Sequence, residues 1–185
     1  MIQALSRFIL KIFGWQAELA VQMADKCVLV GAPHTSNWDF PLAILGMSAM
    51  GIKFNWVAKH TLFRWPLGYI MRSLGGIPLD RHSGGTGFAI KAVETFQELD
   101  RFVLAIAPEG TRHKTNYWKA GFYKIAAKSS VPIALGYVDF RKKKIGIGKV
   151  FMTSGDREGD FALVKDFYKD KTGKYPEKQG EIRLK

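Results

Sequence analysis

Residues 26–39 read Lys26-Cys27-Val28-Leu29-Val30-Gly31-Ala32-Pro33-His34-Thr35-Ser36-Asn37-Trp38-Asp39. The segment opens with a short apolar run that ends at a glycine, which is typical of a buried β-strand. The polar residues that follow can cap a helix that starts near Trp38. A strand, a polar turn and a helix in this order form the repeating unit of an α/β domain.

The same alternation continues along the chain and sets the fold class. We predict one α/β domain over residues 1–185, with a mostly parallel mixed sheet that is flanked by helices and a core at 26–151. An apolar content of 47% is enough for a single core. The predicted strands are 26–31, 54–58, 77–79, 102–107, 132–138 and 144–151, and the predicted helices are 38–50, 87–99, 120–128 and 161–169.

Two polar motifs stand where predicted strands end. His34 follows the strand at 26–31, and Glu109 follows the strand at 102–107. In open α/β sheets, ligands bind beyond the carboxyl ends of the strands. We therefore expect the two motifs to share one site.

His34 and Asp39 are the candidate catalytic pair. Asp39 falls in the first turn of the predicted helix, where its carboxylate can turn back towards the imidazole of His34. An Asp in that position fixes the ring tautomer and stabilises imidazolium, so the other ring nitrogen can take a proton from an alcohol. The alternative is an Asp that caps the helix beside a surface histidine.

The segment Glu109-Gly110-Thr111-Arg112 is the candidate site for an anionic substrate. Glycine lets backbone amides approach a ligand, threonine supplies a hydroxyl, and the arginine fork matches a phosphate at two points. The alternative is a polar turn in which Glu109 and Arg112 only pair with each other.

Arg81 is a second candidate phosphate ligand. It ends the segment Gly75-Gly76-Ile77-Pro78-Leu79-Asp80-Arg81, and a surface pair between Asp80 and Arg81 is its alternative explanation. The remaining histidines are not spaced as metal ligands, so we predict no metal site.

The chain is strongly basic, with a formal net charge of +12. This charge favours partners that carry phosphates or carboxylates: nucleic acid, anionic lipid, coenzyme A or an acidic carrier protein. We expect no nucleic-acid partner, because the aromatic residues lie within apolar runs and no recognised binding motif is present. Cys27 is the only cysteine, which rules out an intrachain disulfide and indicates a buried strand thiol.

The N-terminal segment 1–17 is predicted to form an amphipathic helix. At helical spacing its apolar residues share one face, and Arg7 and Lys11 lie mostly elsewhere. This pattern is typical of a helix that lies in a membrane interface, and the alternative is a helix packed on its own domain. At the other end, the basic tail 170–185 is predicted to be loosely held.

Four segments together resemble the glycerolipid acyltransferase family, whose best-known members acylate glycerol 3-phosphate or lysophosphatidate. The family's His-x4-Asp block is similar to His34 through Asp39, and its second block to Gly75 through Arg81. The third block is similar to Pro108 through Arg112, and the fourth to Val131-Pro132-Ile133. Four blocks in the family's order are a specific signal.

The resemblance implies direct acyl transfer from an acyl-CoA or acyl-carrier-protein thioester to a lysophospholipid hydroxyl, most simply that of 1-acylglycerol-3-phosphate. No other cofactor is implied. His34 would be the general base and Asp39 its orienting partner. The acceptor would be held by Arg81, Glu109, Gly110, Thr111 and Arg112.

Departures from the family pattern leave other functions open. Pro33 and the His113-Lys114 pair differ from common family members beside the implied acceptor site, so another lysolipid, such as a lyso-ornithine lipid, is an alternative acceptor. A non-catalytic basic module that binds anionic membrane is the alternative from another class. In the preferred interpretation, the enzyme works in phospholipid synthesis as a peripheral protein at the cytoplasmic face of the inner membrane.

Overall fold

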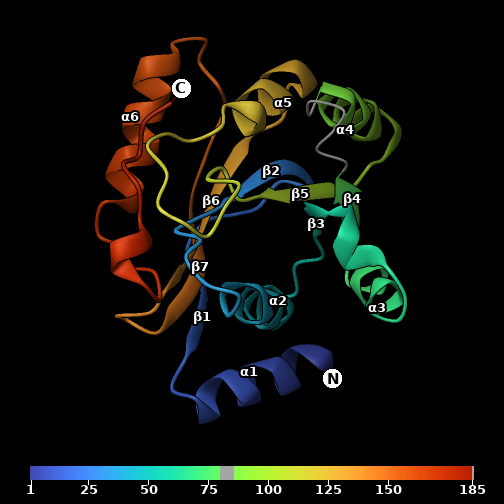
Figure 1. The fold of residues 1–185 in the computed structure, drawn as a ribbon, viewed down its shortest axis with the longest axis vertical. Coiled ribbons are helices and arrows are strands. Elements are labelled where there is room, and N and C mark those ends of the chain that lie inside the picture. Colours follow the sequence, from blue (N-terminus) through green and yellow to red (C-terminus); the bar gives the residue numbers. More distant parts are fainter. Residues whose placement is uncertain (80–85, 185) are drawn as a thin grey trace.

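The computed structural model describes residues 1–79 and 86–184, and it places a central sheet between layers of helices (Figure 1). The sheet has seven strands in the order β1-β7-β6-β2-β5-β3-β4 within this part of the chain. β6 and β7 pair antiparallel, and the other neighbouring strands pair parallel. The predicted single α/β domain with a mostly parallel mixed sheet is confirmed. The strands are β1 (Gln16–Leu19), β2 (Lys26–Gly31), β3 (Asn55–Lys59), β4 (Gly76–Leu79), β5 (Phe102–Ile106), β6 (Ile133–Asp139) and β7 (Lys144–Phe151).

The helices form three layers around this sheet. α4, α5 and α6 cover one face, α2 covers the other, and α1 lies outside α2 (Figure 1). The helices are α1 (Ile2–Ile12), α2 (Asp39–Met50), α3 (Leu67–Ser73), α4 (Thr86–Glu98), α5 (Gly121–Ser129) and α6 (Arg157–Tyr168), with 3-10 turns η1 (His60–Phe63) and η2 (Pro176–Lys178).

Strand β2 is buried on both faces, which explains its unbroken apolar run. Val28 and Val30 belong to the core under α4, α5 and α6, whereas Cys27 and Leu29 face the α2 layer. Burial raises the pKa of the Cys27 thiol to about 12, in agreement with the predicted buried strand thiol. The two-sided packing fixes the end of β2, and with it the loop that carries His34.

Helix α2 is apolar all round because it is enclosed between the sheet and α1. Met47 packs into the core on the sheet side, and Ala49 packs with Leu10 of α1 on the opposite side. Gly46 brings the helix close to β7, since a Cβ at this position would lie 2.4 Å from a side-chain carbon of Ile145. Packing on both sides therefore fixes the helix that begins at Asp39.

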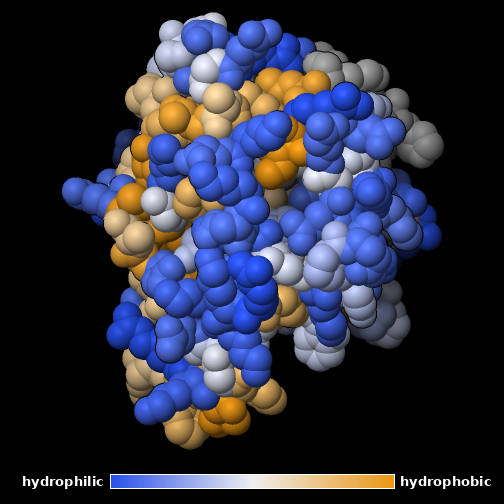
Figure 2. All heavy atoms as spheres, turned by 90° about the vertical axis from the view of Figure 1, so that its left-hand side faces the viewer, coloured by the Kyte–Doolittle hydropathy of each residue, from blue (hydrophilic) through white to orange (hydrophobic). Residues whose placement is uncertain are grey.

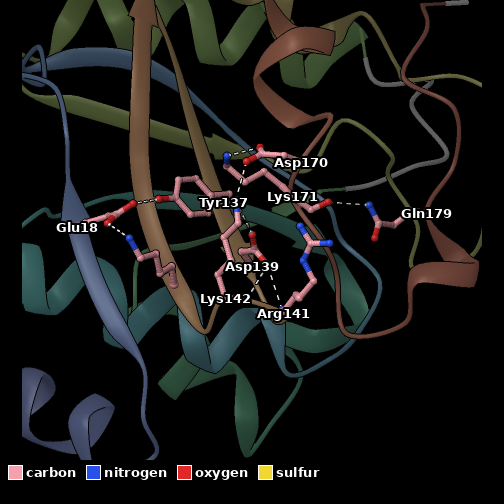
Figure 3. A network of polar contacts seen from close by, with 9 residues as sticks. Glu18, Tyr137, Asp139, Arg141, Lys142, Asp170, Lys171 and Gln179 are labelled. Atoms are coloured by element: carbon pink, nitrogen blue, oxygen red, sulfur yellow. Dashed lines mark hydrogen bonds and ion pairs between the residues drawn. The ribbon is translucent and has the colours of Figure 1, made fainter.

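The C-terminal segment 170–184 is attached to the domain, in contrast to the loosely held tail predicted from its composition. The backbone N–H of Phe140 donates to Thr172 over 2.8 Å, and Leu184 pairs with Trp118 in a β-bridge. Lys142 also forms an ion pair of 2.6 Å with Asp170, which ties the segment to the β6–β7 turn (Figure 3). These contacts join residues far apart in sequence, so composition alone could not predict them.

The predicted elements differ from the observed ones at four places. The N-terminal helix, predicted over 1–17, ends at Ile12, because Gly14 with a φ of +74° turns the chain and residues from Gln16 onwards form β1. β1, α3 and the first turn of α6 were not predicted, because their residues lack a clear apolar period. Within residues 1–79 and 86–184, no helix is both long enough and apolar enough to cross a bilayer.

Candidate active site

The site lies at the carboxyl ends of β2 and β5, which are adjacent parallel strands in the sheet. The loop after β2 carries His34, and the loop after β5 carries Glu109 through Arg112. The backbone N–H of His34 donates to Glu109 Oε1 over 2.9 Å and joins the two loops directly. The two polar motifs therefore share one site, as the sequence predicts.

The His34 imidazole and the Asp39 carboxylate are in direct contact. His34 Nδ1 lies 3.0 Å from Asp39 Oδ2, and the same oxygen accepts the backbone N–H groups of Thr35 and Ser36, each over 2.9 Å. Asp39 is buried as the first residue of α2, whereas the His34 side chain is partly exposed. This contact orients the ring and leaves its Nε2 for a substrate.

Glu109 is buried, with only 4% of its surface exposed. Besides its bond to the His34 amide, its second carboxylate oxygen has no hydrogen-bond partner in the part of the chain that is described. Burial raises the pKa of Glu109 to about 7, and the bond from His34 opposes this shift only in part. Glu109 thus supports the loop of the candidate catalytic pair, His34 and Asp39, from inside the protein.

The other residues of the third family block, Gly110 through Arg112, make contacts different from those of Glu109. Gly110, with a φ of +64°, turns the chain after Glu109, and Thr111 Oγ1 accepts the backbone N–H of His113 over 3.2 Å. The Arg112 guanidinium donates to Asn37 Oδ1 in the first loop. The alternative in which Glu109 and Arg112 pair with each other is wrong, because each contacts the first loop separately.

A cavity of about 1140 Å³ opens beside the catalytic pair. Its polar wall includes both residues of the pair together with Thr111 and Arg112, while Glu109 does not line it. The cavity continues as an apolar slot between α2 and the sheet, lined by Phe40, Ala43, Met47, Met50, Phe54 and Trp56. A site of this shape fits a substrate with a polar head and a long apolar chain.

Glu109 instead borders a second, smaller cavity on the other side of the loops. This cavity has a volume of about 20 Å³ and is shared with Trp118, Tyr168 and Gln179. The Tyr168 hydroxyl lies 2.9 Å from the Val30 carbonyl oxygen and 2.8 Å from that of Gly136, which fixes the ring behind the end of β2 and the middle of β6.

Some site residues were not predicted from the sequence, and one predicted residue is not described. Arg81 lies outside the described residues. Lys119 lines the large cavity, and a Cβ at Gly110 would lie 3.0 Å from its ammonium nitrogen. Thr35 accepts the backbone N–H of Tyr175 over 3.2 Å. No spacing in the sequence signals these contacts, since they join separate loops.

Within residues 1–79 and 86–184, no group of three or more His, Cys, Asp or Glu side chains is arranged to hold a metal ion. The pair contact, the third motif and the apolar slot together set the chemistry of the site. They provide a histidine that is oriented by a carboxylate, an exposed guanidinium and an apolar slot.

Comparison with known proteins assigns the family. The family model described as Acyltransferase matches residues 17–134, more than half of the chain. The chain belongs to the acyltransferase family. The acyltransferase also resembles the crystal structure of the 1-acyl-sn-glycerophosphate (LPA) acyltransferase PlsC from Thermotoga maritima, with a TM-score of 0.59. That match has 20% identity and covers 94% of this chain and 80% of PlsC, so it shows a shared fold.

No curated protein matches the acyltransferase. The family that its four sequence blocks predict is nevertheless confirmed, and so is the prediction that it is an enzyme of the acyltransferase class. The roles of His34, Asp39 and the third motif remain predictions that rest on the geometry described above.

Proposed function

We propose that the acyltransferase moves a fatty acyl group from an acyl-CoA or acyl-carrier-protein thioester to the hydroxyl of a lysophospholipid, 1-acylglycerol-3-phosphate in the first instance. One observation carries the proposal: the His34–Asp39 pair lies at the wall of a large cavity that continues into an apolar slot. The acceptor and a long acyl chain thereby reach the same base. A lysolipid with another head group is the second candidate acceptor.

The reaction follows from the free ring nitrogen of His34. Nε2 takes the proton of the acceptor hydroxyl while its oxygen attacks the thioester carbonyl carbon. Asp39, held at Nδ1, stabilises the imidazolium that forms. When the tetrahedral intermediate collapses, the carbon–sulfur bond breaks and the imidazolium returns its proton to the thiolate. The products are an ester and a free thiol, and no acyl-enzyme forms.

The acceptor phosphate is assigned to the cationic wall of the cavity. Arg112 is exposed and is positioned by Asn37, so its fork can bind a phosphate at two points. Lys119 lines the cavity nearby and can contribute a second charge. Thr111 also lines this wall, and Gly110 provides the turn that brings these groups together.

The acyl chain is assigned to the slot between α2 and the sheet. Its lining residues Phe40 and Met47 come from α2, and Phe54 and Trp56 come from the β3 region. Burial of each methylene of the chain contributes roughly 0.8 kcal/mol, so long chains are favoured over short ones.

We also propose that the acyltransferase is a peripheral protein at the cytoplasmic face of the inner membrane, attached through α1. Leu10 and Ser6 of α1 are buried, and the Ser6 hydroxyl donates to Ser48 of α2 over 3.0 Å. The apolar residues on the outer side are exposed, and hydrophobic atoms appear at the end of the molecule where α1 lies (Figure 2). These exposed residues are Ile2, Leu5, Phe8, Ile12 and Phe13.

The sequence leaves two alternatives for this helix, packing on its own domain or lying in a membrane interface, and α1 can do both. α1 packs on its own domain through a small, partly polar side, and it presents its apolar side outwards. Lys11 and Lys143 lie near the end of the helix, where Lys143 Nζ donates to the Phe13 carbonyl over 3.3 Å. An apolar helix face with nearby cations fits an anionic bilayer surface.

The proposed activity is tested by release of free thiol from palmitoyl-CoA and from palmitoyl-acyl-carrier protein, with and without 1-acylglycerol-3-phosphate. We expect release that requires the acceptor and that His34→Ala lowers by about 10²–10⁴-fold. The matched control is His60→Ala, which removes a histidine outside the pair that does not line the cavity. Unchanged release by His34→Ala would contradict the assigned base, and absence of release with both donors and a panel of lysolipids would contradict the proposed activity.

A further inference from the structure

A second group of apolar side chains is exposed on η1 and α3, away from α1 in the sequence. Trp65 is 93% exposed and Tyr69 is 82% exposed. Four more apolar residues of the same stretch, between 37% and 52% exposed, surround them: Leu62, Leu67, Ile70 and Leu74. We call these six residues the α3 surface.

The α3 surface is held from behind, so its exposure is not caused by a loose backbone. Gly68 packs directly on the preceding turn, since a Cβ there would lie 1.9 Å from the Phe63 carbonyl oxygen. The Arg72 guanidinium donates to that same oxygen over 3.1 Å and lies over the Phe63 ring. The Trp56 indole N–H donates to the Leu74 carbonyl over 2.9 Å. The inner side of α3 is therefore fixed, and its apolar side chains face outwards.

The charged residues in the stretch of chain that carries the α3 surface have one sign. Residues 40–79 contain four cations and no Asp or Glu. The cations are Lys53, Lys59, Arg64 and Arg72, and each is exposed. Exposed Trp and Tyr next to cations are typical of residues that lie at the head-group level of an anionic bilayer.

The α3 surface is also continuous with the large cavity. Leu62 and Leu67 belong to both, and they line the cavity together with Lys59, Thr61 and Met71. An apolar path thus runs from the outside of α3 to the slot beside the catalytic pair. A lipid that follows this path keeps its chain out of water from the bilayer to His34.

From these observations we propose that the α3 surface is a second contact with an anionic phospholipid bilayer, and that the lipid acceptor passes from the bilayer across it into the cavity. The inference rests on the proposed function, since it assigns the route by which the acceptor reaches the site. A bilayer fits better than an acidic protein, because the two most exposed residues are aromatic and the surface is mainly apolar.

The test compares Trp65→Ala/Tyr69→Ala with Ile90→Ala/Leu163→Ala. The control pair removes exposed apolar side chains of α4 and α6 that do not line the cavity. Each variant is measured for flotation with vesicles of phosphatidylcholine and phosphatidylglycerol, and for thiol release with two acceptors. One acceptor is long-chain 1-acylglycerol-3-phosphate in those vesicles, and the other is a short-chain form below its critical micelle concentration.

We expect the α3 variant to bind vesicles about tenfold more weakly and to lose kcat/KM for the vesicle acceptor by a similar factor. Its activity with the soluble acceptor and the behaviour of the control pair should stay at the wild-type level. An α3 variant that matches the wild type with both acceptors would overturn the inference while leaving the proposed function standing. A variant that instead changes the oligomeric state or the binding of acyl-carrier protein would also overturn it, in favour of a protein partner.

A measurement that needs no activity separates the two proposals. Vesicles with brominated acyl chains quench tryptophans that reach the acyl region, so Trp65→Phe should lose part of the quenching seen in the wild type. Trp118→Phe, which removes a buried indole, is the control. Quenching that is equal in Trp65→Phe and the wild type would overturn the bilayer contact even if thiol release were normal.

Discussion

The two sides of the His34 loop differ in what they contribute. On the cavity side, His34, Thr111 and Arg112 are partly or fully exposed and line the large cavity, where we propose that substrates bind. On the inner side, Glu109 and Thr35 are buried and contact the backbone of neighbouring segments. Residues from one short motif thus divide between groups that line the cavity and groups that hold the loop. Proximity within a motif does not imply a shared role.

The largest expected effect belongs to the cavity side. Asp39→Asn keeps the size of the side chain but removes the charge that stabilises imidazolium at His34. We expect kcat for thiol release to fall by about 10²–10⁴-fold and by no more than in His34→Ala, because Asp39 acts through His34. Circular dichroism should show an intact fold. A loss that appears only in KM would contradict the role of Asp39 and weaken the division between the two sides.

On the inner side of the loop, the main expected effect of Glu109 is on the free energy of unfolding. The pKa of Glu109 is raised to about 7 in the folded protein by burial, compared with its ordinary value of 4.5. The folded state therefore keeps a proton that the unfolded chain releases, so the stabilising effect is present below pH 4.5 and is lost as the pH rises to about 7. The corresponding change in unfolding free energy is about 3 kcal/mol.

Glu109→Gln should remove this pH dependence, because glutamine does not titrate. Urea unfolding of the wild type and the variant between pH 4.5 and 8 gives the difference directly. Exposed Glu94→Gln is the control. If stability depends on pH in the same way in the wild type and in Glu109→Gln, the pKa of Glu109 is not raised in the folded protein. Its burial would then not keep the carboxyl protonated.

Kinetics distinguish a positioning role of Glu109 from the acceptor-binding role that the sequence predicts. Glu109→Ala leaves the His34 amide without its acceptor, which costs about 1–3 kcal/mol for a buried group. We expect kcat to fall by about 10–100-fold with little change in the KM for the acceptor. Glu109→Gln should restore most of the activity, since its side-chain carbonyl can accept the same N–H. A raised KM with normal kcat would instead place Glu109 at the acceptor.

The sequence predicts the fold well because the main strands are buried on both faces. The β2 run at Lys26–Gly31 and the β5 run at Phe102–Ile106 carry a strong apolar signal that parallel pairing requires. β1 was missed because Gln16–Leu19 is a short edge strand of mixed character, which is defined by its pairing with β7. Such a strand depends on tertiary contacts, which local composition does not report.

The candidate site shows the same limit. His34 and Asp39 are predicted together because a helix start between them determines how the chain turns. The direction of Glu109 could not be predicted, because it depends on the distance between two loops that are 75 residues apart. The contacts of the C-terminal segment were missed for the same reason, since its basic composition resembles that of an unattached tail.

The smallest expected effect tests whether that segment supports the loop. Gly173 packs against Thr35, and a Cβ there would lie 2.6 Å from Thr35 Oγ1. Gly173→Ala should therefore displace Thr35 and, with it, the adjacent His34. We expect a loss of kcat of a few-fold and a stability loss of about 1 kcal/mol. Gly87→Ala is the matched control, because a Cβ at Gly87 meets nothing within 4 Å.

If Gly173→Ala lowers stability but leaves kcat unchanged, the C-terminal segment only stabilises the domain and does not position the catalytic pair. If it lowers kcat as expected, the effect should be absent in a His34→Ala background, because the segment then acts through His34. That double-mutant comparison separates an effect on the position of His34 from a general effect on the fold. It therefore tests whether the inner side of the loop acts on the cavity side or only stabilises the domain.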